Sequence, residues 1–267
     1  MLGPPGPGTT SFLRQIDLTP LSLRRGPLVG GMGGARGCDW LFFHEAVFLI
    51  GSGLFAIHEE PAAWGRFLEL VAWYRPPVPV QGIVLTLALN DLLISSEDQE
   101  REYVRKFRDR IGELESRLKV RAPTYLVFTK LDLLNGFAER FASLDEPERS
   151  RVLGVPFPLD DGVRPAALFG EFCREWHERW MAEGPSEFSR QFLLALPRLT
   201  GFLERLEGTF LRGAYLTSAT QEGLPLDLTG TARPLVQERT AGSRSYFIRR
   251  LGSGVLLPDV ELAQPAD

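Results

Sequence analysis

A glycine-rich stretch near the amino terminus, GPPGPGTT over residues 3–10, has the spacing of a phosphate-binding loop. In such loops backbone N–H groups cradle the phosphates, a lysine neutralises the β and γ groups, and a Ser or Thr hydroxyl binds magnesium. Here Thr9 stands where the lysine belongs, while Thr10 retains a hydroxyl. Pro7 removes one of the N–H donors, because proline has none. The stretch predicts the shape of a phosphate loop without its charge.

Two further loops carry groups suited to a purine base. The segment 129–132 (TKLD) follows the apolar run PTYLVF, and the segment 217–219 (TSA) follows GAYL. Lys130 can lie along a purine ring, Asp132 can accept two hydrogens from guanine, and the backbone near Ala219 can donate to the guanine carbonyl. An alternative is equally open: Lys130 and Asp132 could simply tie the loop together.

These loops follow segments typical of buried strands. The run GIVLTLAL (82–89) is almost continuously apolar, as in strands covered on both faces of a parallel sheet, and so is PTYLVFTK (123–130). Between them, Ser96 and Gln99 form a capping box before apolar residues spaced by three and four, which predicts a long amphipathic helix. Strand, helix and strand in this order predict a right-handed parallel crossover.

The earlier part of the chain supplies shorter elements. FLRQI (12–16) predicts a short helix, and the stretch after it, GPLVGGMGGARG, is a glycine-rich loop. Strands at 40–43 and 46–50 form a hairpin that turns near His44. AAWGRFLELVAWY predicts a helix. Its apolar positions are Trp64, Phe67, Leu68, Val71 and Tyr74.

Residues 136–212 are mostly helical by pattern, and we expect Trp176 and Trp180 to belong to the core rather than to an interface. GAYLTSATQEG (213–223) is the last strand and its loop. Beyond it the chain is rich in turn formers, which predicts an extended or loosely ordered segment, followed by a short helix and an apolar stretch in 245–263.

Four loops at strand ends, 3–10, 51–53, 129–132 and 217–219, follow the order found in P-loop GTPase-like domains, where ligands bind beyond the carboxyl ends of the strands. We therefore expect an α/β fold with a mainly parallel sheet flanked by helices. Only Met1 and Leu2 precede the glycine loop, so either the first strand is missing or the loop lacks its usual support. We expect the absence of that strand to destabilise the fold or to leave a slot open to another strand.

This order predicts a GTPase-like core over 1–135, a helical insert over 136–212, the last core strand and its loop over 213–223, and a C-terminal extension over 224–267.

Composition excludes several classes of function. A net charge of −4 and a pI near 5.6 provide no basic field for nucleic acid. Cys38 and Cys173 are too few for a disulfide framework or a cysteine-rich zinc site. No apolar run is long enough to span a membrane, and the first residues lack the features of a signal peptide.

Metal and hydrolase sites are also not indicated. The three histidines, His44, His58 and His177, lie far apart without the spacing of metal ligands. No G-x-S-x-G elbow is present, and Ser52 has no base placed by the sequence.

Several segments together resemble the IcmF/TssM family of the type VI secretion membrane complex, over nearly the whole chain. They are GPPGPGTT, GGMGGARGCDW, PVQGIVLTLALNDLL, PTYLVFTKLDLLNGF, LRGAYLTSATQEGLPLD and RSYFIRRL. The resemblance implies a cytoplasmic GTPase-like domain of a much larger inner-membrane protein. Its partners would be other proteins of the membrane complex and of the baseplate, and its place the cytoplasmic face of the bacterial inner membrane.

Compared with the family pattern, the side of the site that would bind phosphate and metal lacks expected residues. Besides Thr9, Ala35 stands where the family pattern has a threonine for magnesium, and Gly51 stands where a D-x-x-G turn would have its aspartate, with Leu54 in place of the glycine. The residues of the base side remain. We expect a vestigial nucleotide site with no catalytic and no metal-binding residues. Its members are Gly3, Gly6, Gly8, Thr9, Thr10, Thr129, Lys130, Asp132, Ser218 and Ala219.

The resulting interpretation is a structural pseudo-GTPase, not an enzyme, that works as a scaffold through protein contacts and needs no cofactor. One alternative is a switch that binds GTP or GDP weakly without efficient hydrolysis. Another is a true enzyme that recruits a lysine from elsewhere, although Lys106 and Lys119 belong to the amphipathic helix.

Overall fold

A four-stranded sheet forms the centre of the computed structural model, which describes residues 1–4, 6, 8–21, 38–51, 61–75, 78–159, 162–219, 225–230 and 244–266. The strand order is β3 (Ile83–Ala88), β5 (Thr124–Thr129), β7 (Leu211–Leu216) and β6 (Gly154–Pro156). The first three are parallel and β6 is antiparallel. Every residue of β3 and β5 is buried, as their apolar runs predict. The expected mainly parallel α/β sheet is confirmed.

A hairpin lies beyond the free edge of β3. Its strands are β1 (Cys38–Phe42) and β2 (Val47–Gly51), paired antiparallel as predicted. Among the described residues, Met1 and Leu2 lie between β2 and β3: the Leu2 N–H donates to the Val84 carbonyl at 2.9 Å, and the Gly51 N–H donates to the Met1 carbonyl at 2.9 Å. These two residues thus link the hairpin to the sheet.

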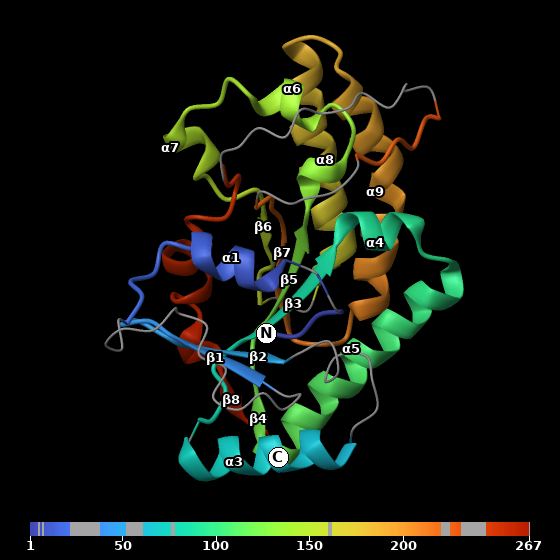
Figure 1. Ribbon diagram of the computed structural model, residues 1–267. Helices are drawn as coiled ribbons and strands as arrows, with labels where there is room; N and C mark the ends of the chain where they lie inside the picture. The colour runs from blue at the N-terminus through green and yellow to red at the C-terminus, as the bar shows by residue number, and fades with distance from the viewer. Residues whose placement is uncertain are drawn as a thin grey trace.

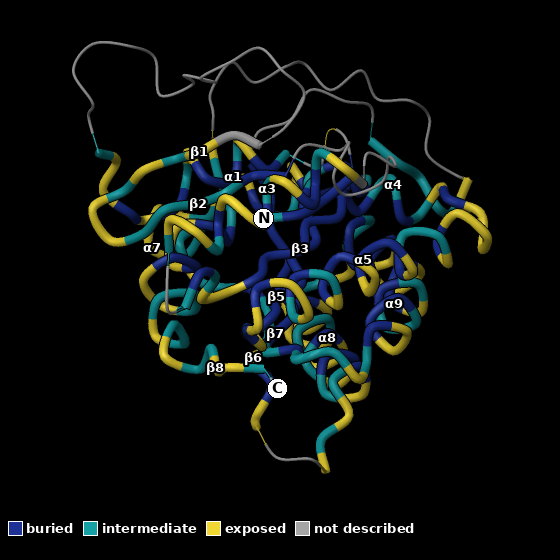
Figure 2. Tube along the Cα trace, turned by 90° about the horizontal axis from the view of Figure 1, so that it is seen from below, coloured by how far each residue is buried: buried dark blue, intermediate teal, exposed yellow. Residues whose placement is uncertain are grey.

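Helices cover both faces of the sheet, as Figure 1 shows. One face packs against α3 (Pro61–Tyr74), α5 (Glu97–Leu118), α8 (Pro165–Ala182) and α9 (Glu187–Leu206). The other packs against α1 (Thr9–Gln15) and the C-terminal segment 244–266. Figure 2 shows the buried residues concentrated in the strands and in the helix faces turned toward them. Side chains that alternate along β3, such as Val84 and Leu85, therefore enter two separate cores.

The long helix α5 begins at the predicted capping box, with Ser96 and Gln99 bonded reciprocally. In the insert, Trp180 is buried and packs with Trp176 and Phe188, which confirms that the tryptophans belong to the core. The predicted helix 62–74 is confirmed as α3, and Tyr74 at its end is 74% exposed.

Short elements complete the fold. They are α4 (Leu89–Ile94), the 3₁₀ helix η1 (Leu131–Leu133), α6 (Phe137–Phe141), α7 (Glu146–Arg149), β4 (Val120–Arg121), the π-helical turn η2 (Gly252–Leu256), the 3₁₀ helix η3 (Val260–Leu262) and β8 (Gln264–Pro265). The sequence did not predict β6, which lies inside the expected helical insert. The glycine-rich loop 26–37, which contains Ala35, and residues 52–60, which contain Leu54, lie outside the described residues.

The C-terminal segment 244–266 packs against the sheet. Tyr246 pairs with Ser218 at one end of the sheet, and β8 pairs with β4 at the other. Ile248 and Leu251 are buried between these points. Among the described residues, no helix has both the length and the apolar character needed to cross a membrane.

Candidate functional site: loops at the carboxyl edge of the sheet

The described parts of three loops singled out in the sequence, 3–10, 129–132 and 217–219, lie at one edge of the sheet, because β3, β5, β7 and Met1–Leu2 run in the same direction (Figure 1). Of the fourth loop, 51–53, only Gly51 is described. The glycine loop leaves Leu2 and enters α1. Gly6 and Gly8 have φ of 77° and 76°, in the left-handed region that glycine adopts without strain. Gly8 is the N-cap of α1, and its carbonyl accepts the Phe12 N–H at 2.8 Å. Pro5 and Pro7 lie outside the described residues.

The side chain of Thr9 is turned toward the sheet. Thr9 is buried, and its Oγ1 lies 3.1 Å from Oγ1 of Thr86 in β3, so the two hydroxyls share a hydrogen bond. Thr10, the next residue, is exposed. The residue in the lysine position is therefore part of the packing between α1 and β3.

The loops that follow β5 and β7 are tied together. The Ser218 hydroxyl donates to Oδ1 of Asp132 at 2.5 Å, and the Leu131 N–H donates to the Thr217 carbonyl at 3.0 Å. The structure brings Asp132 and Ser218 into direct contact. Lys130, which joins β5 to η1, has a φ of 60°, and Thr129 before it is buried.

The C-terminal segment contacts the same site. The Ser218 N–H donates to the Tyr246 carbonyl at 3.0 Å, and the Tyr246 N–H returns a bond to Ser218 at 2.7 Å. Ala219 is buried in the core that also holds Ile248. The backbone N–H of Ser218 is thus already bonded within the chain. Sequence reasoning missed Tyr246, although it lies in the RSYFIRRL segment.

A third loop, also missed, follows β3. Asn90 and Asp91 open α4 there, and the Asn90 side-chain amide donates to Oδ1 of Asp91 at 2.8 Å. Burial raises the pKa of the Asp91 carboxyl, and the positive charge of Lys130 opposes that shift. The signal was two polar residues directly after a buried strand. The carboxyl edge therefore combines a carboxylate and a lysine from neighbouring loops.

Comparison with known proteins identifies the family. Residues 58–209 and 198–267 match the family model of the IcmF-related N-terminal domain. The chain belongs to the IcmF/TssM family. A curated relative in this family, the type VI secretion system component TssM1 of Pseudomonas aeruginosa strain PAO1, is 35% identical over 291 residues. That alignment covers 94% of this chain but 26% of the relative, so the chain spans about a quarter of the relative's length.

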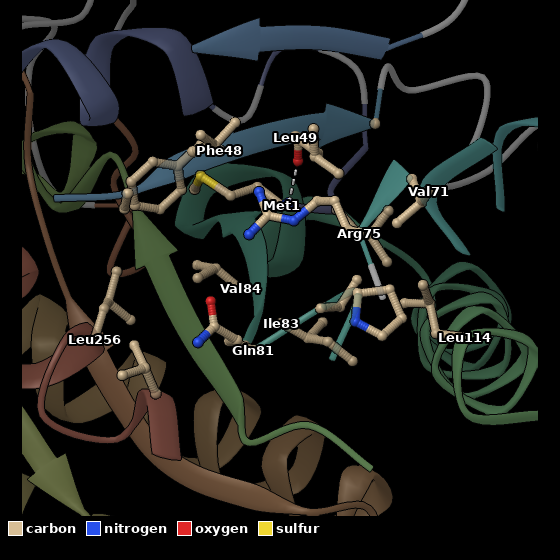
Figure 3. A pocket seen from close by; sticks show the side chains of 18 of the residues that line it. Met1, Phe48, Leu49, Val71, Arg75, Gln81, Ile83, Val84, Leu114 and Leu256 are labelled. Atoms are coloured by element: carbon tan, nitrogen blue, oxygen red, sulfur yellow. Dashed lines mark hydrogen bonds between the residues drawn. The ribbon is translucent and has the colours of Figure 1, made fainter. Parts of the chain in front are cut away.

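Among the described residues, no group of three or more His, Cys, Asp or Glu side chains is arranged to hold a metal ion. His58 lies outside that part of the chain. A cavity of 350 Å³ lies between β2 and β3, and none of the ten predicted site residues lines it (Figure 3).

Proposed function

We propose that this chain is a structural pseudo-GTPase module of a type VI secretion membrane complex. It acts by contacts with other proteins of the membrane complex and the baseplate, at the cytoplasmic face of the inner membrane. Membership of the IcmF/TssM family and the similarity to TssM1 support the secretion role. The observation that carries the pseudo-GTPase assignment is the hydrogen bond between Thr9 and Thr86.

The Thr9 position decides the phosphate chemistry. A P-loop lysine reaches the β- and γ-phosphates, whereas Thr9 is neutral, short and bonded to the sheet. Losing one charge-assisted contact to phosphate costs about 1.5–3 kcal/mol, roughly a ten- to hundredfold loss of affinity. Gly51, in place of the metal-side aspartate, weakens magnesium binding further. Both losses fall on the hydrolytic half of the site.

The lateral order of strands supports a GTPase-like ancestry. The hairpin β1–β2 is followed by Met1–Leu2, then β3, β5 and β7, with the site loops at their carboxyl ends. In open α/β sheets this edge is where ligands bind. This arrangement supports the proposal of a former nucleotide site that has lost its phosphate chemistry.

A second candidate function is a switch that binds guanine nucleotide without hydrolysing it. The contact between Asp132 and Ser218 favours it, since it holds the carboxylate beside the loop that would receive guanine. The same bond also serves the structural alternative, because it ties two loops together. In the switch, guanine would have to share Asp132 with the Ser218 hydroxyl.

Nucleotide binding and turnover separate these functions. We expect no change in the melting temperature of the protein with millimolar GTP, GDP or ATP in the presence of magnesium, and no release of phosphate. A rise with GTP and GDP but not ATP, lost in Asp132→Ala and kept in the exposed control Asp109→Ala, would establish the switch. Magnesium-dependent GTP turnover that Asp132→Ala abolishes would refute the pseudo-GTPase assignment.

A further inference from the structure

Three consecutive residues of the C-terminal segment fasten the loop that follows β7. Tyr246 exchanges two backbone hydrogen bonds with Ser218, and the Phe247 N–H donates to the carbonyl of Arg149, the last residue of α7, at 2.6 Å. The side chains of Phe247 and Ile248 are buried. We call Tyr246, Phe247 and Ile248 the clasp, because together they join this loop to α7.

The backbone of the clasp is strained at Phe247. Its φ is 63°, in the left-handed region that glycine adopts freely and an aromatic residue rarely adopts. For a residue with a Cβ this conformation costs a factor of roughly 5 to 30 in a conformational equilibrium. In a regular strand Tyr246 and Phe247 would point to opposite faces. Here both pack against the core that contains α8, and Ile248 turns into the other core, so the left-handed residue marks a change of direction.

Contacts with the helical insert hold the strained conformation in place. The centroid of the Phe247 ring lies 5.6 Å from that of Phe141 in α6 and 6.0 Å from that of Trp176 in α8, edge to face in both cases. The Tyr246 ring lies 5.1 Å from that of Phe137, also edge to face. A strained residue persists only when its surroundings hold it there. Here α6 and α8 do so, and a shift of these helices weakens the clasp.

The clasp is also connected to the candidate site. Ser218, whose backbone is bonded to Tyr246, donates its hydroxyl to Asp132 in the loop after β5. A continuous series of contacts therefore runs from the aromatic rings of α6 and α8 through the clasp to both loops. Such a series couples two sites when one of its members has two discrete arrangements. The backbone of Phe247 is such a member, because its relaxed alternative has a negative φ.

We infer that the clasp is a two-state element that couples the helical insert to the loops at the carboxyl edge. In the closed state Phe247 packs against the insert and Ser218 is held beside Asp132. In the open state Phe247 takes a negative φ and leaves the insert, and Ser218 loses both backbone bonds to Tyr246. A protein that binds α6 or α8 and favours the open state thereby releases the loops. This coupling does not depend on whether the loops bind nucleotide.

Hydrogen exchange of backbone amides, measured by NMR without nucleotide, tests whether the clasp opens as a unit. We expect the amides of Ser218, Tyr246 and Phe247 to share one opening constant within about threefold, and this constant to exceed those of Leu126 and Val127 in β5 at least about tenfold. The proposal is overturned if the three constants differ by more than that, or if they do not exceed the β5 constants by this margin.

Two substitutions at one position test the strain. Phe247→Ala and Phe247→Gly both remove the ring, but only glycine relieves the left-handed backbone. We expect the opening constant of the clasp, reported by the Ser218 amide, to be at least about threefold larger in the alanine variant. At a residue with negative φ the order is reversed, because glycine gains more freedom in the open state. Equal constants, or the reversed order, contradict a strained clasp.

Variants in the insert test the coupling. Trp176→Phe alters a contact of the Phe247 ring, whereas Arg179→Ala changes an exposed residue of the same helix. We expect Trp176→Phe to raise the opening constant of Ser218 at least about fivefold relative to the β5 amides, which correct for any general loss of stability. Phe141→Leu, at the other contact, should act in the same direction. If neither variant exceeds the effect of Arg179→Ala, the insert and the loops are not coupled. Nucleotide titration of the parent protein tests the pseudo-GTPase assignment separately.

Discussion

Oγ1 of Thr9 and Oγ1 of Thr86 lie 3.1 Å apart inside the protein, joining the first turn of α1 to the central strand β3. Thr86 is fully buried, and its hydroxyl also donates to the Leu2 carbonyl over a longer distance, 3.4 Å. Thr9, which stands at the lysine position of the phosphate-loop pattern, therefore has a structural role.

This role predicts an asymmetry between adjacent threonines. Thr9→Ala should lower the free energy of unfolding by about 1–2 kcal/mol, because it leaves the Thr86 hydroxyl poorly bonded. Thr10→Ala, which removes an exposed hydroxyl, should change it by less than about 0.5 kcal/mol. Urea denaturation of both variants measures the difference, and equal effects would contradict the structural role of Thr9.

Thr9→Lys should not produce GTP turnover, because the residues expected to bind magnesium are still absent.

The bond between Ser218 and Asp132 predicts a second effect on stability. Ser218→Ala removes a buried hydroxyl that donates to a carboxylate, and should cost about 1.5–3 kcal/mol. Ser116→Ala on the exposed face of α5 is the matched control, with an expected change within about 0.5 kcal/mol. Chemical denaturation gives both values. A loss at Ser218 no larger than at Ser116 would show that the two loops do not depend on this contact.

A buried carboxylate holds α5 to α9. Glu100 is 2% exposed, its Oε2 lies 3.0 Å from Nη2 of Arg198, and Oε1 accepts from Arg205. Removing one member of a buried ion pair costs about 3–5 kcal/mol. Here the side chains of both arginines are more than a third exposed, so water can solvate them when the carboxylate is lost. We therefore expect Glu100→Gln to lower the free energy of unfolding by about 2–4 kcal/mol.

Glu97→Gln, three residues earlier on the exposed face, is the control for that change. Its ion pair with Arg101 is solvated on both sides and should contribute less than about 1 kcal/mol. Thermal and urea unfolding should show a clearly larger loss of stability for Glu100→Gln than for Glu97→Gln. Similar losses would mean that burial of Glu100 adds nothing to the packing of the insert against the core.

Alkaline pH should reveal a buried phenol. Burial and the hydrogen bond to Asp259, at 2.9 Å, raise the pKa of Tyr125 above its usual range. Above pH 10 the unfolded chain loses this proton while the folded chain keeps it, so stability falls as pH rises. At neutral pH, Tyr125→Phe should cost about 1–2 kcal/mol, and this cost should shrink above pH 10. Denaturation at pH 8 and 10.5 measures the change; exposed Tyr74→Phe should leave the pH dependence intact.

Local patterns were enough to predict the elements that depend on near neighbours in the chain. The fully buried run of β3, the Ser96 capping box and the parallel crossover to β5 were all predicted, because burial periodicity and cap chemistry are local. Spacing alone does not tell where the partner surface of a helix ends: Tyr74 follows the apolar spacing of α3 but is exposed, because α3 extends beyond the core at that residue.

Pairings across the chain could not be predicted in this way. The strand β6 is three residues long and exists because Gly154 fits against Tyr215 of β7, where a Cβ would lie 2.5 Å from the ring. The Tyr246 bond to Ser218 joins residues on either side of a long turn-rich stretch. The candidate site residues were predicted individually, but their mutual contacts depend on such long-range pairing.

The C-terminal segment has a mechanical consequence. It crosses the molecule from Tyr246 at the site loops to β8, where the Ala266 N–H donates to the Lys119 carbonyl at 2.9 Å. Tension applied to the end of this segment would first load the short β4–β8 pairing and pass through it to the end of α5. After that pairing yields, the pull would reach Asp259, the partner of Tyr125 and Arg212, and only then the loops at the opposite edge.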